Sequence, residues 1–284
     1  MANPPSSPSF DWKMYRYTPS LAAAILFLTL FTLLTILHMY NYIRSRRTSV
    51  IYIILGGLCE IAGFGARIGS HFDNTAWAAF IIQGTLLLVG PLFFAATVYM
   101  MLGRTVRYAG AEKVSRLSPR WYTRAFVTAD ISTLIVQGLG ASLMGTMQLG
   151  FAIAGEKVVI AGLALQVATF VVFLVATVDF HVRLNRLSKA EQGAEAWAWK
   201  KMLRILYTLS SLILFRCVFR LIEYAMGNAA YPIAHEWTLY VFDGVPMLAV
   251  LIMLFAWQSK EPDVSQKSED EASSDGELGI VSSR

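Results

Sequence analysis

The residues of this chain best suited to binding chemistry are two arginines and a glutamate inside a long apolar stretch. Arg216, Arg220 and Glu223 fall within residues 203–225, a run long enough to cross a bilayer as a helix. At about 100° per residue, the three side chains share one stripe of that helix. Each charge at the centre of a span costs about 2.5–3.5 kcal/mol on insertion scales. Two arginines on one span therefore require acidic partners on other spans.

Other apolar stretches supply such partners. Apart from Asp179, at the end of its stretch, the charged residues of these other stretches are Glu60, Arg67, Asp130 and Asp243. Glu60 and Arg67 point the same way, about 10 Å apart along one helix, and Gly63 leaves room for a partner helix near that face. A rise of about 1.5 Å per residue places Glu60 near the midplane. The side chains that it places in the outer half are Arg67, Arg216, Arg220, Glu223 and Asp243.

The convergence of these charges from three spans predicts ion pairs. We expect Glu60 to pair with Arg216. For Asp243 the expected partner is Arg220 or Arg67. Such pairs either fix the register of the helices or line a polar cavity that holds an amphiphilic substrate, or passes it across. Intramembrane ionisable residues favour the second interpretation, because they are costly to keep without a function.

A second set of polar residues is predicted on the fourth and fifth spans. Asp130 lies near the cytoplasmic end of the span at residues 125–148, and Gln137 follows one heptad later. Several glycines near them give that helix a small face for close packing. Gln166 on the next span is a further buried polar residue. These three residues join the candidates for substrate binding.

Two prolines interrupt the apolar stretches. Pro91 follows Gly90, and Pro246 lies two residues after Gly244. They either bend helices around the predicted cavity or are tolerated kinks without a mechanical role.

Seven apolar stretches position all of these residues. The chain has 284 residues, of which 56% are hydrophobic and only 15% charged, which is not the composition of a soluble domain. Each stretch has about 20 residues or more, so a helix can satisfy its own backbone groups in lipid. The expected spans are residues 19–40, 50–70, 76–102, 125–148, 158–180, 203–225 and 237–257. We therefore predict an all-α membrane protein, a bundle of seven transmembrane helices.

The basic residues predict the orientation of this bundle. The loops after the first, third and fifth spans hold three, six and five Lys or Arg residues, whereas the other three loops hold one in total. This bias predicts an N-terminus outside and a C-terminus in the cytoplasm. We expect residues 1–18 to form an extracellular segment, residues 19–257 the transmembrane domain, and residues 258–284 a disordered acidic cytoplasmic tail.

Other kinds of chemistry find little support in the sequence. Both cysteines fall in predicted spans, and the four histidines show no metal-binding spacing. We interpret His71, Asp73, His235 and Glu236 as polar residues of outer loops. No phosphate-binding loop for ATP occurs. The sequence therefore predicts no enzyme activity, no metal and no cofactor. It also predicts no nucleic-acid partner, because its basic residues flank membrane spans.

The chain also resembles a known family over residues 15–257. Residues 60–64 with Arg67 resemble the E-x-x-G-aromatic-x-x-R signature of the fungal lipid-translocating exporter family, also called RTA-like and named for resistance to aminocholesterol. One departure is Phe64, where the family usually has tyrosine. Further matching residues follow in order: Gln83, Pro91, Tyr99, Asp130, Gln137, Gly138, Gly162, Gln166, Phe215, Arg216, Phe219, Arg220, Glu223, Glu236, Tyr240, Asp243 and Pro246.

This resemblance implies a membrane transporter. Members are associated with export or flipping of sphingoid long-chain bases, with resistance to toxic amphiphiles and, in one branch, with porphyrin uptake. We therefore predict an ATP-independent translocator of amphiphilic lipids, with membrane lipids and amphiphilic small molecules as partners. The plasma membrane is the expected location, and the vacuolar or another endomembrane is the alternative.

The candidate substrate-binding residues combine the buried charges with the family pattern. They are Glu60, Arg67, Asp130, Gln137, Gln166, Arg216, Arg220, Glu223, Tyr240 and Asp243. An ammonium head group would be held by the carboxylates and a carboxylate head group by the arginines. The alternative function is that of a seven-helix receptor or sensor of a lipid-like ligand.

Overall fold

The described part of the chain is helical. The computed structural model describes residues 19–72, 77–108, 119–144, 149–187, 194–227 and 231–258, and these ranges contain no strand. The predicted extracellular segment at residues 1–18 lies outside the described residues, as does nearly all of the predicted acidic tail. Their assignments therefore stay predictions.

Within the described residues, seven helical segments are long and apolar enough to cross a membrane, which confirms the predicted bundle of seven helices. The first six are α1 (Leu21–Ser45), α2 (Thr48–Phe72), α3 (Trp77–Tyr108), α4 (Pro119–Met144), α5 (Leu149–Leu187) and α6 (Ala194–Ala225). The seventh is composite and follows the short helix α7 (Tyr231–Ala234). It consists of α8 (Glu236–Leu239), the π-helix η2 (Tyr240–Gly244) and α9 (Val245–Gln258).

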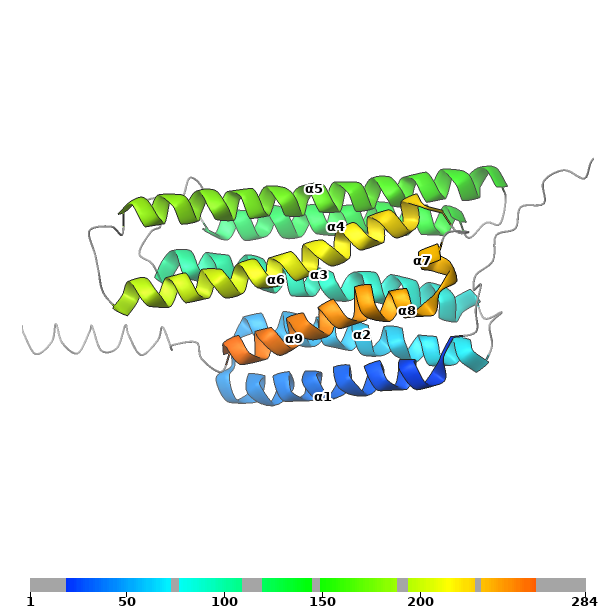
Figure 1. Cartoon of the computed structure of the whole chain (residues 1–284), viewed down its shortest axis with the longest axis horizontal. Coiled ribbons are helices and arrows are strands. Elements are labelled where there is room, and N and C mark those ends of the chain that lie inside the picture. The colour runs from blue at the N-terminus through cyan, green and yellow to red at the C-terminus, as the bar shows by residue number, and fades with distance from the viewer. Residues whose placement is uncertain are drawn as a thin grey trace, which may run out of the picture.

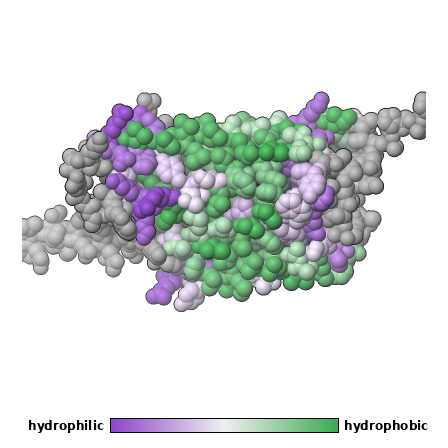
Figure 2. Space-filling view, viewed as in Figure 1, coloured by the Kyte–Doolittle hydropathy of each residue, from purple (hydrophilic) through white to green (hydrophobic). Residues whose placement is uncertain are grey.

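The surface matches a membrane environment. A broad band of hydrophobic residues covers the middle of the face in view, and hydrophilic residues gather towards both ends (Figure 2). Large apolar side chains such as Leu139 and Val175 are 60% and 64% exposed. An apolar surface of this extent in water would mark an interaction site or an aggregation hazard, whereas lipid covers it without cost.

The helices continue past the apolar stretches, so the predicted boundaries are too short. α5 has 39 residues, which corresponds to about 58 Å, almost twice the thickness of a bilayer core. Its last turns carry the ion pair between Asp179 and Arg183, four residues apart. α5 and α6 project beyond the other helices at the end opposite α7 (Figure 1). Hydropathy predicts only the lipid-facing part, because helices extend into water where polar residues and such pairs support them.

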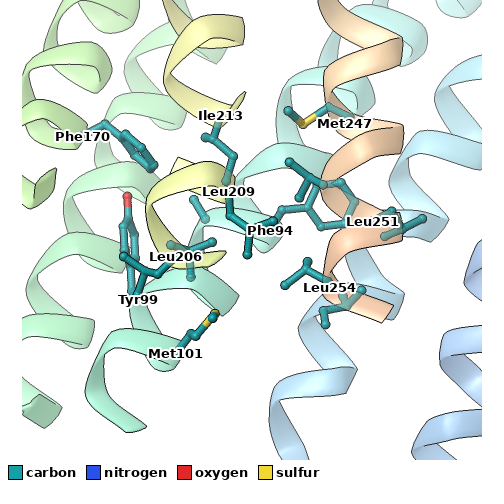
Figure 3. Packing of buried hydrophobic residues seen from close by; sticks show 14 of the residues in the cluster. Phe94, Tyr99, Met101, Phe170, Leu206, Leu209, Ile213, Met247, Leu251 and Leu254 are labelled. Carbon is teal, nitrogen blue, oxygen red and sulfur yellow. The ribbon is translucent and has the colours of Figure 1, made fainter. Parts of the chain in front are cut away.

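α3 lies at the centre of the bundle. It packs against α2, α4, α6 and α9, whereas α9 also packs against α1 and α6 and so closes the ring of helices. In the membrane-spanning part of α3, 72% of the residues are buried inside the protein, whereas this share is at most 50% in every other span. In Figure 3 its side chain Phe94 lies between Leu209 of α6 and Leu251 of α9, and the ring of Tyr99 has its centroid 6.0 Å from that of Phe170 on α5.

Glycines set the closest helix contacts. A Cβ atom on Gly63 of α2 would lie 2.7 Å from the side chain of Leu87 on α3, and would therefore clash. Between α4 and α5, a Cβ atom on Gly155 would lie 2.5 Å from the carbonyl oxygen of Gly140. Gly138, two residues before Gly140, has no such neighbour within 4 Å. The predicted small face of α4 is thus confirmed at Gly140, where the two backbones touch.

Candidate functional site

Buried charges join α6 to η2. Asp243 forms an ion pair through Oδ1 with Nε of Arg216, and its Oδ2 lies 2.5 Å from Nη2 of Arg220. Nη1 of Arg220 lies 2.8 Å from Oε2 of Glu223. These four side chains are at most 10% exposed. The predicted pair between Asp243 and Arg220 is confirmed. Together with Glu60, these four residues are called the charged cluster below.

Arg216 also binds the backbone of α3 at the point where a proline interrupts that helix. Pro91 has no N–H group, so it cannot bond to the carbonyl of Leu87, four residues earlier. Nη2 of Arg216 donates a hydrogen bond to this carbonyl instead. An unsatisfied backbone group inside a membrane costs several kcal/mol. Pro91 therefore provides an acceptor for Arg216, a role beyond the two that the sequence suggested.

The π-helix η2 presents Asp243 to α6. The N–H of Val245 bonds to the carbonyl of Tyr240, five residues earlier, which is the bond of a π-turn. Such turns rotate the residues that follow and occur frequently at functional sites. A Cβ atom on Gly244 would lie 2.7 Å from the ring of Phe27, so α1 packs directly against this turn. The turn and its contact with α1 hold the carboxylate of Asp243 in place.

Glu60 belongs to the same region but is not part of these ion pairs. Its side chain is 2% exposed, and its Oε1 has no hydrogen-bond partner among the described residues. The predicted pair between Glu60 and Arg216 is wrong, because Asp243 and the carbonyl of Leu87 occupy that guanidinium. The sequence predicts the depth of a side chain in the membrane, whereas the rotation of each helix about its axis depends on packing.

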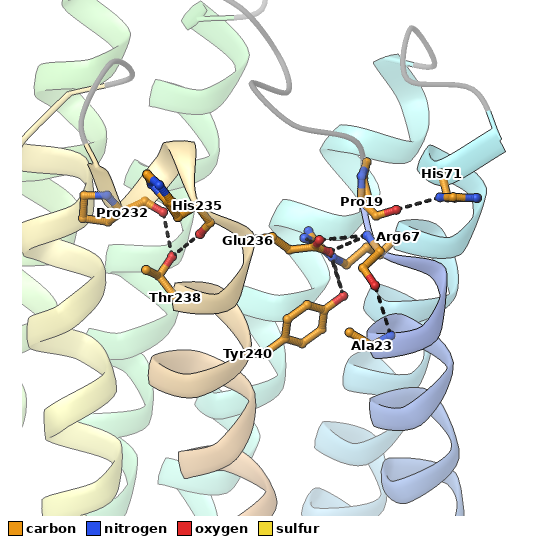
Figure 4. Close-up of polar contacts among 10 residues, drawn as sticks. Pro19, Ala23, Arg67, His71, Pro232, His235, Glu236, Thr238 and Tyr240 are labelled. Atoms are coloured by element: carbon orange, nitrogen blue, oxygen red, sulfur yellow. Dashed lines mark hydrogen bonds and ion pairs between the residues drawn. The ribbon is translucent and has the colours of Figure 1, made fainter.

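A second network lies at the end of the bundle that holds α7 and α8 (Figure 4). Nη2 of the fully buried Arg67 lies 2.8 Å from Oε1 of Glu236, and its Nε donates to the Tyr240 hydroxyl at 3.0 Å. That hydroxyl donates to Oε1 of Glu236 at 3.1 Å. The backbone N–H of Ser20 lies 2.7 and 2.9 Å from the two carboxylate oxygens of Glu236. These four residues are called the rim cluster.

The rim cluster corrects two predictions. Glu236 is not a solvated loop residue, since its side chain is only 17% exposed and joins three elements. It is also a carboxylate partner of Arg67, a role that the sequence gave to Asp243 as one alternative. Hydropathy places Glu236 outside the seventh span because the apolar run begins at Trp237. The family pattern, which includes Glu236, is the signal that pointed to it.

The other polar residues of the predicted outer loops differ in their contacts. His71 Nδ1 lies 2.6 Å from the carbonyl oxygen of Pro19, so the segment before α1 is also bonded to α2. His235 is exposed, as predicted, and its ring stacks on Tyr231 with centroids 3.7 Å apart. Asp73 lies outside the described residues.

We expect Glu236→Gln to loosen the attachment of the chain at Ser20. The amide keeps an acceptor but loses the charge that strengthens the bonds from Ser20 and Arg67. The difference between a charged and a neutral hydrogen bond is about 1 kcal/mol. Amide hydrogen exchange at Ser20 should accelerate about fivefold as a result. Glu156→Gln on α5 serves as the control, and equal exchange in both variants would show that the carboxylate contributes nothing to this attachment.

A third polar set lies between α3, α4 and α5. The Tyr99 hydroxyl donates to Oδ2 of Asp130 at 2.8 Å, and Nε2 of Gln137 donates to Oε1 of Gln166 at 3.0 Å. Asp130 and Gln137 are buried as predicted, whereas Gln166 is only partly buried. Within the described residues, Oδ1 of Asp130 and Oε1 of Gln137 have no hydrogen-bond partner. The sequence indicated no partner for Asp130, although Tyr99 is among the residues of the family pattern.

The structure therefore distributes the ten candidate residues over three places. The charged cluster holds Glu60, Arg216, Arg220, Glu223 and Asp243, the rim cluster holds Arg67 and Tyr240, and the third set holds Asp130, Gln137 and Gln166. The described residues contain no group of three or more His, Cys, Asp or Glu side chains suited to a metal ion. Buried opposite charges of this kind can hold an ionised head group.

Comparison with known proteins gives one consistent result. Residues 53–261 match the family described as "RTA1 like protein". The chain is 32% identical to Protein RTA1 of Saccharomyces cerevisiae, with 87% of this chain and 85% of the relative covered. It is 30% identical to Protoporphyrin uptake protein 1 of that species, with 84% and 89% covered. It is 25% identical to the Sphingoid long-chain base transporter RSB1, also of that species, with 87% and 75% covered. No solved structure matches the chain.

Proposed function

This chain belongs to the RTA1-like protein family, and we propose that it transports lipid-like amphiphiles across a membrane without hydrolysing ATP. Two relatives are named for the transport or uptake of compounds that combine a large apolar body with ionisable groups. The seven apolar helices indicate an integral, multi-pass membrane protein, and we propose the plasma membrane as its location.

The observation that carries this proposal is the charged cluster. Five ionisable side chains from α2, α6 and η2 lie at most 10% exposed among membrane-spanning helices. Pairs that only fix register require fewer charges, and burying them costs several kcal/mol per ion before pairing. An amphiphile head group is the kind of ligand for which such a site is suited, because its tail can remain in the lipid.

The path we propose runs along the faces of α2, α6 and η2. The head group passes from the rim cluster at Arg67 and Glu236 to the charged cluster at Asp243, while the tail stays between helices or in lipid. Because both clusters are buried in this conformation, passage requires α6 or the composite seventh span to move. The π-turn of η2 and Pro246 are weak points in the backbone hydrogen-bonding of that span.

A reconstitution experiment tests the proposal. The purified protein is incorporated into liposomes that contain a sphingoid base with a fluorescent label on its tail, so that the head group stays native. A membrane-impermeant quencher then measures how fast the probe moves between leaflets. We expect movement several-fold faster than in protein-free liposomes, without ATP or any partner protein.

The same liposomes separate the alternatives. An Asp179→Asn variant, altered on the exposed end of α5, should transport like the wild type. Tight binding of the probe without any change in its distribution would contradict transport and favour the receptor function. Chemical conversion of the probe, detected by mass spectrometry, would instead indicate an enzyme.

A further inference from the structure

The charged cluster contains one carboxyl group more than it needs. Its carboxyls are those of Glu60, Glu223 and Asp243, and its guanidiniums are those of Arg216 and Arg220, which gives three against two. Asp243 contacts both arginines and Glu223 contacts Arg220. Neither arginine forms an ion pair with Glu60 in the described part of the chain. The surplus group is therefore Glu60.

The surroundings of Glu60 make a bare negative charge there expensive. Its side chain is 2% exposed, and Oε1 lacks a hydrogen-bond partner among the described residues. An isolated buried carboxylate is far costlier than its neutral form, whereas a paired one is tolerated. The facing groups are Asp243 from η2, which repels a negative charge, and Arg216 and Arg220 from α6, which already bind Asp243.

Further neighbours of Glu60 come from α3 and from α2 itself. From α3 the uncharged Gly90 approaches it closely, since a Cβ atom there would lie 2.8 Å from Oε1. On α2 itself the neighbouring titratable group is the partly buried Cys59. A positive ion beside Glu60 is thus the one ligand that would balance the cluster, and a proton is the smallest such ion.

We propose that Glu60 is a cation-exchange site that holds a proton in the resting protein and releases it when the ammonium head of an amphiphile binds beside it. The O–H bond of the carboxyl breaks, the proton passes to water, and the carboxylate pairs with the incoming ammonium, so the total charge of the site is unchanged. This inference rests on the proposed function, because it assigns both the head-group class and the counter-ion of that transport.

The arrangement of the cluster favours a cationic over an anionic head group. A carboxylate head would have to displace Asp243 or Glu223 from an arginine, since both guanidiniums of the cluster are engaged. An ammonium head displaces only a proton. Exchange of one cation for another also keeps the total charge of the five side chains and their bound cation at zero, so no net charge arises in a medium of low dielectric.

Binding is tested with a probe that cannot carry a proton itself. A fluorescent alkyl trimethylammonium amphiphile is added to the detergent-solubilised protein in weak buffer, and both its affinity and the change in pH are recorded. We expect one proton to be released per bound cation. The affinity should then rise about tenfold per pH unit over the range in which the free site is protonated, because deprotonation must accompany binding.

Two variants make this test specific to position 60. Glu60→Gln imitates the protonated carboxyl and cannot release a proton, so binding should be weak, independent of pH and free of proton release. Glu60→Asp keeps the acid with one methylene less, and should retain proton release with a lower affinity. The carboxylate control, Asp179→Asn, should behave like the wild type. Binding without proton release in the wild type, unchanged coupling in Glu60→Gln, or no binding of the probe would overturn the proposal.

Transport of the same probe separates this inference from the function on which it rests. With the membrane potential clamped, uptake of the probe into liposomes should raise the luminal pH in the wild type, and not in Glu60→Gln. Movement of the probe with no pH change would overturn proton exchange while the transport function stands. Proton release on binding, with no movement of any amphiphile, would support the exchange site and contradict transport.

Discussion

Asp243→Asn is expected to lower the free energy of unfolding by about 3–5 kcal/mol, because it removes the carboxylate from a buried group of ion pairs. The carboxylate of Asp243 is shared by Arg216 and Arg220, and its side chain is 5% exposed. Asparagine has the same shape but no charge, and it has one acceptor oxygen where aspartate has two. Arg216 would therefore lose its charged partner and keep only neutral acceptors such as the carbonyl of Leu87. Thermal unfolding of the purified protein in detergent micelles measures the loss.

Matched variants decide whether the lost charge causes this effect. Asp179→Asn also removes a carboxylate that pairs with an arginine, but Asp179 is 53% exposed and the change should cost about 1 kcal/mol or less. The double variant Asp243→Asn with Arg216→Gln removes charges of both signs, and should recover part of the stability lost in Asp243→Asn alone. Equal losses in Asp243→Asn and Asp179→Asn would mean that water, rather than the carboxylate, compensates the arginines.

Gly155→Ala is the second large effect that we expect, with a loss of about 1–3 kcal/mol from overpacking. The new methyl group would lie 2.5 Å from the carbonyl oxygen of Gly140 and 2.7 Å from the backbone nitrogen of Met144. Backbone atoms cannot rotate away as a flexible side chain can, so α4 and α5 must separate. Thermal unfolding in micelles again measures the change.

The same substitution at Gly138 provides the control, because a Cβ atom there meets nothing within 4 Å. Alanine stabilises a helix interior by about 0.5–1 kcal/mol relative to glycine, so Gly138→Ala should be neutral or stabilising. The two variants introduce the same methyl group on adjacent helices, and their effects should have opposite signs. A stabilising Gly155→Ala would show that α4 and α5 are farther apart at this contact than the 2.5 Å distance to the carbonyl oxygen of Gly140 indicates.

The fold was predictable because a membrane span is a local property of the sequence. Apolar runs identify all seven spans, but they underestimate the lengths of α5 and α6, whose polar ends continue as helix in water. The composite seventh span was not predicted in detail, since nothing in residues 237–257 distinguishes a π-turn from an α-turn. That turn nevertheless determines where Asp243 points. The orientation of the termini remains a prediction from the basic loops.

The sequence predicted which residues form the candidate site better than it predicted which of them form pairs. Depth along a helix follows from residue number, so the sequence correctly grouped Asp243 with Arg220. Rotation about the axis depends on contacts such as Gly63 with Leu87, which involve residues far apart in the chain. The pair between Glu60 and Arg216 failed for that reason. The substrate-binding role of these residues stays a prediction.

The hydrogen bond between Arg216 and the carbonyl of Leu87 links two positions 129 residues apart in the chain. That carbonyl is free only while residue 91 is a proline. In a descendant that lost the proline, the new N–H of residue 91 would compete with the arginine for this carbonyl. A descendant that lost the arginine would leave the carbonyl without a partner in the buried core of the bundle. Proline and arginine should therefore be retained or replaced together as lineages diverge.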